Sequence, residues 1–235
     1  MPRFGFLAAG MLLAAIATAG AGSAPVEETL RYNINWPSGL PLGETEISAR
    51  SLKPDETSGR RWEFTLKLEA AIPGFAVAEL HRSVATAELC SVLLEKQSER
   101  GKRKAKERTS FDLANQTAVR ETLGGGGKSE FAVPACARDA LAFLYFVRRE
   151  LGQGRIPPTQ TVYFGSAYEV RLEYGGRQPV VASESRFEAD RLLVSIKGPA
   201  SQTMFEAFFA VDPPRTPVLV RVPFAPGSFT MELVR

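Results

Sequence analysis

The stretch Val133-Pro-Ala-Cys-Ala-Arg-Asp-Ala-Leu-Ala-Phe-Leu-Tyr-Phe-Val-Arg-Arg-Glu-Leu151 decides the fold, because it is the one strong helix signal after the N-terminal segment. Residues 140–147 are apolar almost all the way round, which is typical of a helix buried on most of its sides. Asp139 near its start and Arg148 near its end carry the charges that the helix dipole favours. Glycine and proline follow and stop the helix. The sequence therefore predicts one buried helix over about 138–151.

The remainder of the mature chain has the pattern of strands and turns. Residues 28–36 and 62–68 alternate between apolar and polar side chains, which is the period of a half-buried strand. After the helix, turn signals recur throughout, including Gly175-Gly176 between predicted strands at 168–174 and 179–183. This spacing favours an antiparallel meander over βαβ units. The predicted fold class is mainly β, a barrel or curved half-barrel around the one buried helix.

The N-terminus has the three parts of a secretory signal peptide, which we assign to residues 1–23. Arg3 gives the positive start, residues 4–16 form the apolar centre, and small residues follow. The candidate cleavage sites are Ala21, Ser23 and Ala24, the last disfavoured by the proline after it. An uncleaved membrane helix is the alternative, although the segment is short and rich in alanine and glycine. We expect a periplasmic or secreted protein without a lipid anchor, since no cysteine stands near the cleavage region.

Length and composition fit a single β-rich domain over residues 26–235. A hydrophobic fraction of 44% is enough for a sizeable core. The net charge of +3 is too small for a general electrostatic attraction to nucleic acid. No later stretch is long and apolar enough to span a bilayer. The pattern indicates no particular oligomeric state.

Cys90 and Cys136 are the only cysteines, and an exported chain meets oxidising conditions. We therefore predict a disulfide between them, which would tie a strand to the start of the helix. Two buried free thiols are the alternative, because free cysteine is among the most buried residue types. A catalytic thiol is disfavoured, since neither cysteine stands in a recognisable motif.

The sequence carries no readable catalytic or metal-binding constellation. His81 is the sole histidine, whereas metal sites and acid–base relays generally need companions. Gly127-Lys128-Ser129 resembles the end of a phosphate-binding loop, but Thr122 stands where the motif requires glycine and a strand pattern follows. We accordingly predict no catalytic residue, no metal and no cofactor.

The aromatic side chains of the strands and the helix have two interpretations. One is ordinary core packing. The other is a barrel interior that leaves room for an apolar ligand, with the helix as lid or plug. The candidate lining residues are Trp36, Trp62, Phe64, Phe143, Tyr145, Phe146 and Phe208.

A basic run between residues 100 and 108 is the most charged part of the chain. It is a candidate contact for anionic headgroups, lipopolysaccharide or cell-wall polymer. The alternative is a solvated hairpin whose lysines discourage edge-to-edge pairing of strands. The candidate contact residues are Arg100, Lys102, Lys104, Lys106 and Arg108.

Several short motifs resemble an exported bacterial family, domain of unknown function 3108. The resembling parts are Tyr32 to Gly43, Trp62-x-Phe64, Val133-Pro134 followed by Asp139 to Arg148, and Asp212-Pro-Pro-Arg215-Thr-Pro217-Val218. The likeness covers roughly residues 28–235. It implies an envelope location and a β-rich fold. It implies no activity, so no catalytic residue is carried over.

The leading functional hypothesis is a non-catalytic exported protein that binds an apolar or lipid-like ligand. The alternative is a structural or assembly partner in the cell envelope with a solid core, which docks a protein or polymer through a sheet edge or the basic hairpin. An enzyme is a third reading, and a cluster of perturbed carboxylates around His81 would favour it. A ligand cavity separates the first hypothesis from the second.

Overall fold

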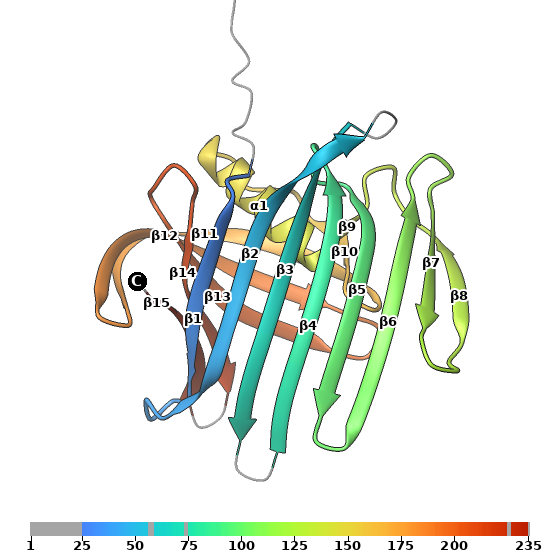
Figure 1. Cartoon of the computed structure of the whole chain (residues 1–235). Coiled ribbons are helices and arrows are strands. Elements are labelled where there is room, and N and C mark those ends of the chain that lie inside the picture. The colour runs from blue at the N-terminus through green and yellow to red at the C-terminus, as the bar shows by residue number, and fades with distance from the viewer. Residues whose placement is uncertain (1–24, 56–58, 73–74, 225–226, 235) are drawn as a thin grey trace, which may run out of the picture.

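The computed structural model describes residues 25–55, 59–72, 75–224 and 227–234, and the predicted signal peptide with its cleavage sites lies outside them. Across these ranges the chain forms one 15-stranded sheet and one helix, α1 (Ala140–Gly152) (Figure 1). The strands are β1 (Glu28–Asn35), β2 (Pro41–Asp55), β3 (Gly59–Ile72), β4 (Phe75–Thr86), β5 (Ser91–Arg100), β6 (Arg103–Asp112), β7 (Thr117–Thr122), β8 (Lys128–Ala132), β9 (Arg138–Asp139), β10 (Gln160–Tyr163), β11 (Ala167–Ala182), β12 (Ser185–Lys197), β13 (Gln202–Ala210), β14 (Pro217–Phe224) and β15 (Gly227–Val234).

The sheet is a meander whose first and last strands meet. Its order is β8-β7-β6-β5-β4-β3-β2-β1-β15-β14-β13-β12-β11-β10-β9. Neighbours are antiparallel except β9 and β10, and β1 pairs with β15 from Arg31 opposite Val234 to Asn35 opposite Thr230. The sheet therefore has two walls. The first wall is β1 to β8, and the second wall is β10 to β15 with the short strand β9 at its end. The sheet curves around the helix (Figure 1). The predicted fold class is confirmed, in the form of a strongly curved sheet that is not closed.

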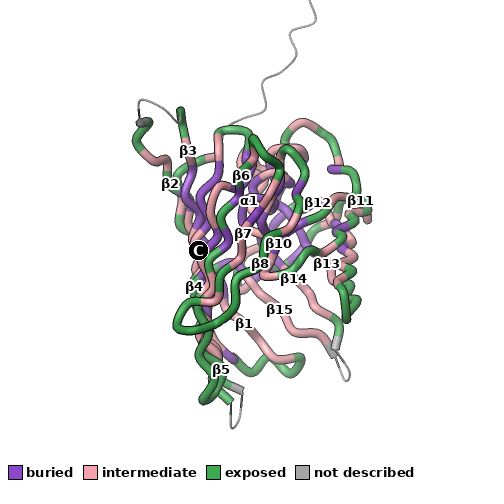
Figure 2. The backbone as a smooth tube through the Cα atoms, turned by 90° about the vertical axis from the view of Figure 1, so that its right-hand side faces the viewer, coloured by how far each residue is buried: buried purple, intermediate pink, exposed green. Residues whose placement is uncertain are grey.

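The helix forms where the sequence predicts it, with a slightly later start. Asp139 is its N-cap, and its carboxylate accepts hydrogen bonds from the backbone amides of Leu141 and Ala142 at 2.8 and 3.1 Å. Arg138 and Asp139 themselves belong to β9, because they pair with β10 before the helix begins. Most of the helix is buried, and Figure 2 shows the buried residues of the chain gathered around it.

The core against the first wall is an aromatic stack. Phe64 lies between Trp62 and Tyr145, with ring centroids 6.4 and 4.2 Å away and nearly parallel planes. Phe64 is fully buried, and Trp62 and Tyr145 are almost so. Trp62 and Phe64 alternate with polar residues along β3 and therefore point to the same face. Tyr145 of α1 completes the stack, so the helix is packed against this wall without a gap in the aromatic layer.

One prediction about the second wall is wrong. Gly175 and Gly176 do not separate two strands, since β11 continues through them as far as Ala182. They form a bulge, seen as a register shift between Tyr174 and Arg177 against β12, and Gly176 has a φ of +94°. A bulge bends a strand and increases its twist, and glycine reaches positive φ without strain. The glycine pair therefore curves the wall instead of ending it.

A buried carboxylate joins the end of the sheet to the first wall. Asp139 is fully buried, and its second carboxylate oxygen accepts hydrogen bonds from the Ser83 hydroxyl of β4 at 2.5 Å and the Ser91 hydroxyl of β5 at 2.6 Å. The backbone amide of Asp139 donates back to the Ser91 hydroxyl at 2.7 Å. Because no ladder of strand pairs spans this gap, these side-chain bonds hold β9 against β4 and β5.

The disulfide between Cys90 and Cys136 stands next to that junction, as predicted, with its Cα atoms 4.8 Å apart. The amide of Ser91 also donates to the carbonyl of Ala137 at 2.8 Å. The bridge closes a loop with a sequence separation of 46, which corresponds to about 4 kcal/mol on the chain-entropy model. It therefore reinforces covalently the same contact that Asp139 makes by hydrogen bonding.

The other end of α1 is fixed by a buried ion pair. The Arg148 guanidinium, 5% exposed, pairs with Glu28 at the start of β1. It also donates to the carbonyls of Pro214 and Arg215 at 3.0 and 3.1 Å. The helix is thus held at both ends by side chains that reach across the interior of the curved sheet, which we call the shell.

Replacing Asp139 with alanine is expected to destabilise the fold strongly. The change removes the helix cap and leaves two serine hydroxyls and two amides without their acceptor, which we expect to lower the free energy of unfolding by about 3–5 kcal/mol. Asp112→Ala is the matched control, because Asp112 caps an exposed turn at Asn115. Thermal melting of both variants is the measurement. Equal, small shifts in melting temperature would contradict the role given to Asp139.

The disulfide is expected to be fully formed in protein exported to an oxidising compartment. Thiol titration of denatured, unreduced protein should then find no free thiol, and the Cys90→Ala, Cys136→Ala double variant should lose about 4 kcal/mol of stability. Two titratable thiols per chain would show that the bridge is absent.

Candidate functional site

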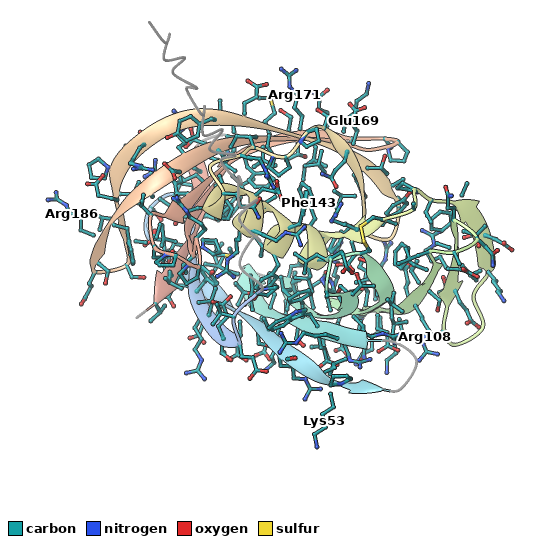
Figure 3. All side chains as sticks on the ribbon, turned by 90° about the horizontal axis from the view of Figure 1, so that it is seen from above. Lys53, Arg108, Phe143, Glu169, Arg171 and Arg186 are labelled. Atoms are coloured by element: carbon teal, nitrogen blue, oxygen red, sulfur yellow. A yellow bond between two sulfur atoms is a disulfide. The ribbon has the colours of Figure 1, made fainter. Side chains whose placement is uncertain are left out.

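A cavity lies between α1 and the second wall. Its volume is about 210 Å³, and its lining is almost entirely apolar. Figure 3 shows Phe143 of α1 on the inside of the shell, whereas charged side chains such as Arg171 and Arg186 project outward. The strand residues that line the cavity are Val162 of β10, Val170 and Leu172 of β11, Leu192, Val194 and Ile196 of β12, Phe205, Ala207 and Phe209 of β13, Pro217 and Val220 of β14, Met231 of β15 and Ile47 of β2.

Sequence periodicity explains why these residues meet. The helix contributes Ala140, Phe143, Leu144 and Val147, whose spacing of three and four residues places them on one face. Strands β11, β12 and β13 contribute alternate residues, which point to one side of the sheet. Ala140 on the helix and Ala207 opposite it are short. The cavity therefore follows from small side chains placed where two apolar faces meet.

The size of the cavity limits what it can hold. An apolar cavity of about 150 Å³ stays dry and binds benzene, whereas drug-sized ligands occupy about 300–1,000 Å³. At about 210 Å³ the cavity fits one small apolar group or a single acyl segment. Ile196, Phe205, Val220 and Met231 are only half-buried, so solvent reaches the cavity at their end.

The structure brings one of the seven aromatic candidates, Phe143, to this cavity. Trp62, Phe64 and Tyr145 form the core stack instead, because their faces are already covered by each other. Trp36 packs edge-to-face against Phe229, with ring centroids 4.7 Å apart.

The last two aromatic candidates lie elsewhere as well. Phe146 packs under the Arg138 guanidinium, 3.8 Å from the ring centroid, and Phe208 is fully buried in the aromatic core. The lining that the sequence reasoning missed is mostly aliphatic, with Phe205 and Phe209 beside the aliphatic residues. Its signal was the alternation of apolar residues in 192–196 and 205–209.

A second, charged pocket of about 320 Å³ lies on the inner face of β4, β5 and β6. There Glu79 accepts hydrogen bonds from Arg100 Nε at 2.8 Å and from His81 Nε2 at 2.9 Å. Burial would raise the pKa of Glu79, but the Arg100 and His81 partners outweigh it and lower this pKa below its usual value. Glu79 is therefore an anion already satisfied by its neighbours.

The turn after β10 packs on this charged face. The ring of Phe164 lies edge-to-face with His81 at 5.0 Å, and Lys96 Nζ stands 4.1 Å from the centre of the same ring. Arg120 of β7 donates to the carbonyl of Gly165. A side chain at position 165 would come within 3.1 Å of Lys96 Nζ, and Gly165 has a φ of +80°. Glycine is therefore needed for this close approach of the two walls.

The basic hairpin between β5 and β6 is less available to anions than its sequence indicates. Three of the five predicted residues are paired: Arg100 with Glu79, Lys104 with Glu99, and Arg108 with Glu95. Lys102 and Lys106 are exposed. The cross-strand register that pairs these charges favours the solvated-hairpin interpretation.

Within the ranges that the structure covers, no group of three or more His, Cys, Asp or Glu side chains is placed to hold a metal ion. In the same part of the chain, no helix has the length and apolar character needed to cross a bilayer. His81 and Glu79 are adjacent, and the Arg100 guanidinium and the Phe164 ring contact this pair.

Comparison with known proteins supports the fold and leaves the activity open. The family model described as "Protein of unknown function (DUF3108)" matches residues 31–234. No curated protein matches the chain. The chain is similar to the crystal structure of a beta-barrel-like protein of domain of unknown function DUF1849 from Brucella abortus, with 10% sequence identity, a TM-score of 0.59, and coverage of 91% of this chain and 98% of that one. At this identity the likeness shows the fold alone.

Stability is expected to depend on the protonation of His81. Burial lowers the pKa of His81, an effect partly offset by its bond to Glu79 and reinforced by Lys96, so the ring takes up its proton at a lower pH in the folded chain than in the unfolded chain. The unfolded chain takes up that proton near pH 6.5, so His81 contributes stability that is present above about pH 6.5 and is lost as the pH falls.

His81→Gln should therefore reduce the fall in melting temperature between pH 7.5 and pH 5.5. Both proteins are compared at both pH values, so that other titrating groups contribute equally. A fall of the same size in wild type and variant would contradict the assignment.

Proposed function

Because the chain belongs to the DUF3108 family, whose description assigns no function, we propose a function from its cavity: the protein is a non-catalytic binder of a small apolar or lipid-like ligand. The single observation that carries the proposal is the apolar cavity of about 210 Å³ between α1 and the second wall. A cavity of this kind separates a carrier from a structural protein with a solid core.

The lining supports an acyl or similar apolar ligand. Burying hydrocarbon contributes roughly 25 cal/mol per Å², and the aliphatic walls offer no hydrogen-bonding partners that a polar ligand would need. Leu144 and Met231 lie at the cavity and are only partly buried, and their flexible side chains allow a ligand to enter without rearranging the shell.

An envelope location is part of the same proposal. It rests on the signal-peptide pattern of residues 1–23 and on a disulfide of the kind that persists in oxidising compartments. In that setting a small shell with an apolar interior suits the carriage or sensing of amphiphiles between membranes.

A second candidate function, docking of an envelope partner, is favoured by one observation. Among the strands that the structure describes, β8 is the last one at its end of the sheet and pairs only with β7. Its residues are mostly exposed, so a partner strand has backbone groups to pair with. Lys128 at the start of this strand is the kind of residue that instead discourages such pairing.

Filling the cavity is expected to abolish ligand binding without unfolding the protein. Titration with naphthalene, an uncharged apolar fluorophore of two fused rings, should give a saturable change in its fluorescence with wild-type protein. Ala207→Leu inserts side-chain atoms into the cavity and should weaken this binding by about tenfold or more, equivalent to about 1.4 kcal/mol.

Ala114→Leu is the control, because Ala114 lies in the exposed turn between β6 and β7. It should bind the fluorophore as wild type does. Unchanged binding by a folded Ala207→Leu protein would place the probe outside this cavity and refute the proposal.

A further inference from the structure

We infer that the charged pocket on the inner face of β4, β5 and β6 holds the anionic head of the same ligand, so that the protein selects a single-chain amphiphile with a phosphate or carboxylate group. This inference rests on the proposed function, because it assigns the head of a ligand whose tail lies in the apolar cavity.

The chain connects the two sites directly. Val162 of β10 lines the apolar cavity, and Phe164 comes two residues later. Residues two apart in an extended chain are about 7 Å apart and point to the same side. The Phe164 ring contacts both His81 and Lys96. The same short segment therefore places Val162 at the cavity and Phe164 against the charged face, with both side chains on the same side of the segment.

The mouth of the cavity lies on the side of that segment. Val170 and Ile196 line the cavity and are paired across β11 and β12, next to the start of β11 at Ala167. The turn after β10 contacts Lys96 through Phe164, and Gly198 in the turn after β12 lies beside Tyr168 at the start of β11. A ligand that leaves the cavity at Ile196 therefore emerges toward the wall that carries Lys96.

The charge of the pocket favours an anion. Its lining holds three cationic side chains, Lys96, Arg100 and Arg103, against two acidic ones, Glu79 and Glu107. Arg100 is already paired with Glu79. Among the described residues, Lys96 and Arg103 make no ion pair within 4 Å. The pocket thus carries a surplus cation, and two of its cations are free to receive a ligand.

Lys96 is the residue that makes the site specific. It is half-buried, and burial lowers the pKa of its amine, so its charge is poorly compensated by solvent. Its direct partner is the Phe164 ring, a weaker partner for an ammonium group than an anion. Glu107 lies opposite it in the strand register, and no ion pair within 4 Å joins the two side chains.

Calorimetric titration with ligands of equal chain length tests the inference. Octyl phosphate and octanol share one tail, and inorganic phosphate supplies the head alone. Wild-type protein should bind octyl phosphate about tenfold more tightly than octanol, and raised salt should reduce this preference. Lys96→Met should remove the preference while leaving octanol binding unchanged.

Two further variants keep the test decisive. Arg103→Gln alters an exposed side chain and provides the same test if Lys96→Met fails to fold. Lys104→Gln is the control, because Lys104 pairs with Glu99 on exposed strand positions and does not line the pocket. It should retain the full preference for octyl phosphate.

The outcomes separate the two proposals. Equal affinity for octanol and octyl phosphate would overturn the head-group inference and leave the apolar site standing. Binding of inorganic phosphate without binding of either octyl compound would overturn both, and would assign the pocket to a free anion. A preference for octyl phosphate that survives both Lys96→Met and Arg103→Gln would place the head elsewhere and refute the assignment.

Discussion

A fully buried carboxylate with four hydrogen-bond donors is the constraint on which this fold depends. The Asp139 carboxylate accepts hydrogen bonds from two backbone amides in the first turn of α1. It also accepts hydrogen bonds from the hydroxyls of Ser83 and Ser91 on the first wall. Burial raises the pKa of Asp139, and only these donors compensate the charge. Asp139 therefore joins the helix, β4 and β5 at one point, and the adjacent disulfide reinforces this junction.

Closure at Asp139 determines what the interior becomes. It presses the aromatic side of α1 onto the first wall, where Phe64 and Tyr145 stack. The opposite stripe of the helix is left facing the second wall across short side chains at Ala140 and Ala207, and the cavity results. The first wall changes character along its length, from aromatic near the helix to charged around Lys96. An interior that is apolar on one side and cationic on the other is the basis on which we propose that the protein selects amphiphiles.

Local signals predicted much of this fold. The helix at 140–152, its cap at Asp139 and the bridge between Cys90 and Cys136 follow from short-range patterns and from the compartment. The cavity could not be predicted from such signals, because it depends on which apolar faces meet across the shell. The large aromatic residues Trp62 and Phe64 fill the core by stacking on each other, whereas the cavity lies beside the short side chains of Ala140 and Ala207. The charged pocket also escaped prediction, since strand register alone brings Glu79, Lys96 and Arg100 together.

Native mass spectrometry of the protein purified from its own envelope, followed by organic extraction, tests the central claim most directly. The account predicts a defined extra mass that extracts as a single-chain amphiphile with an acidic head. Bare protein that takes up no such compound when it is supplied would contradict the account, and would indicate that the shell serves another purpose.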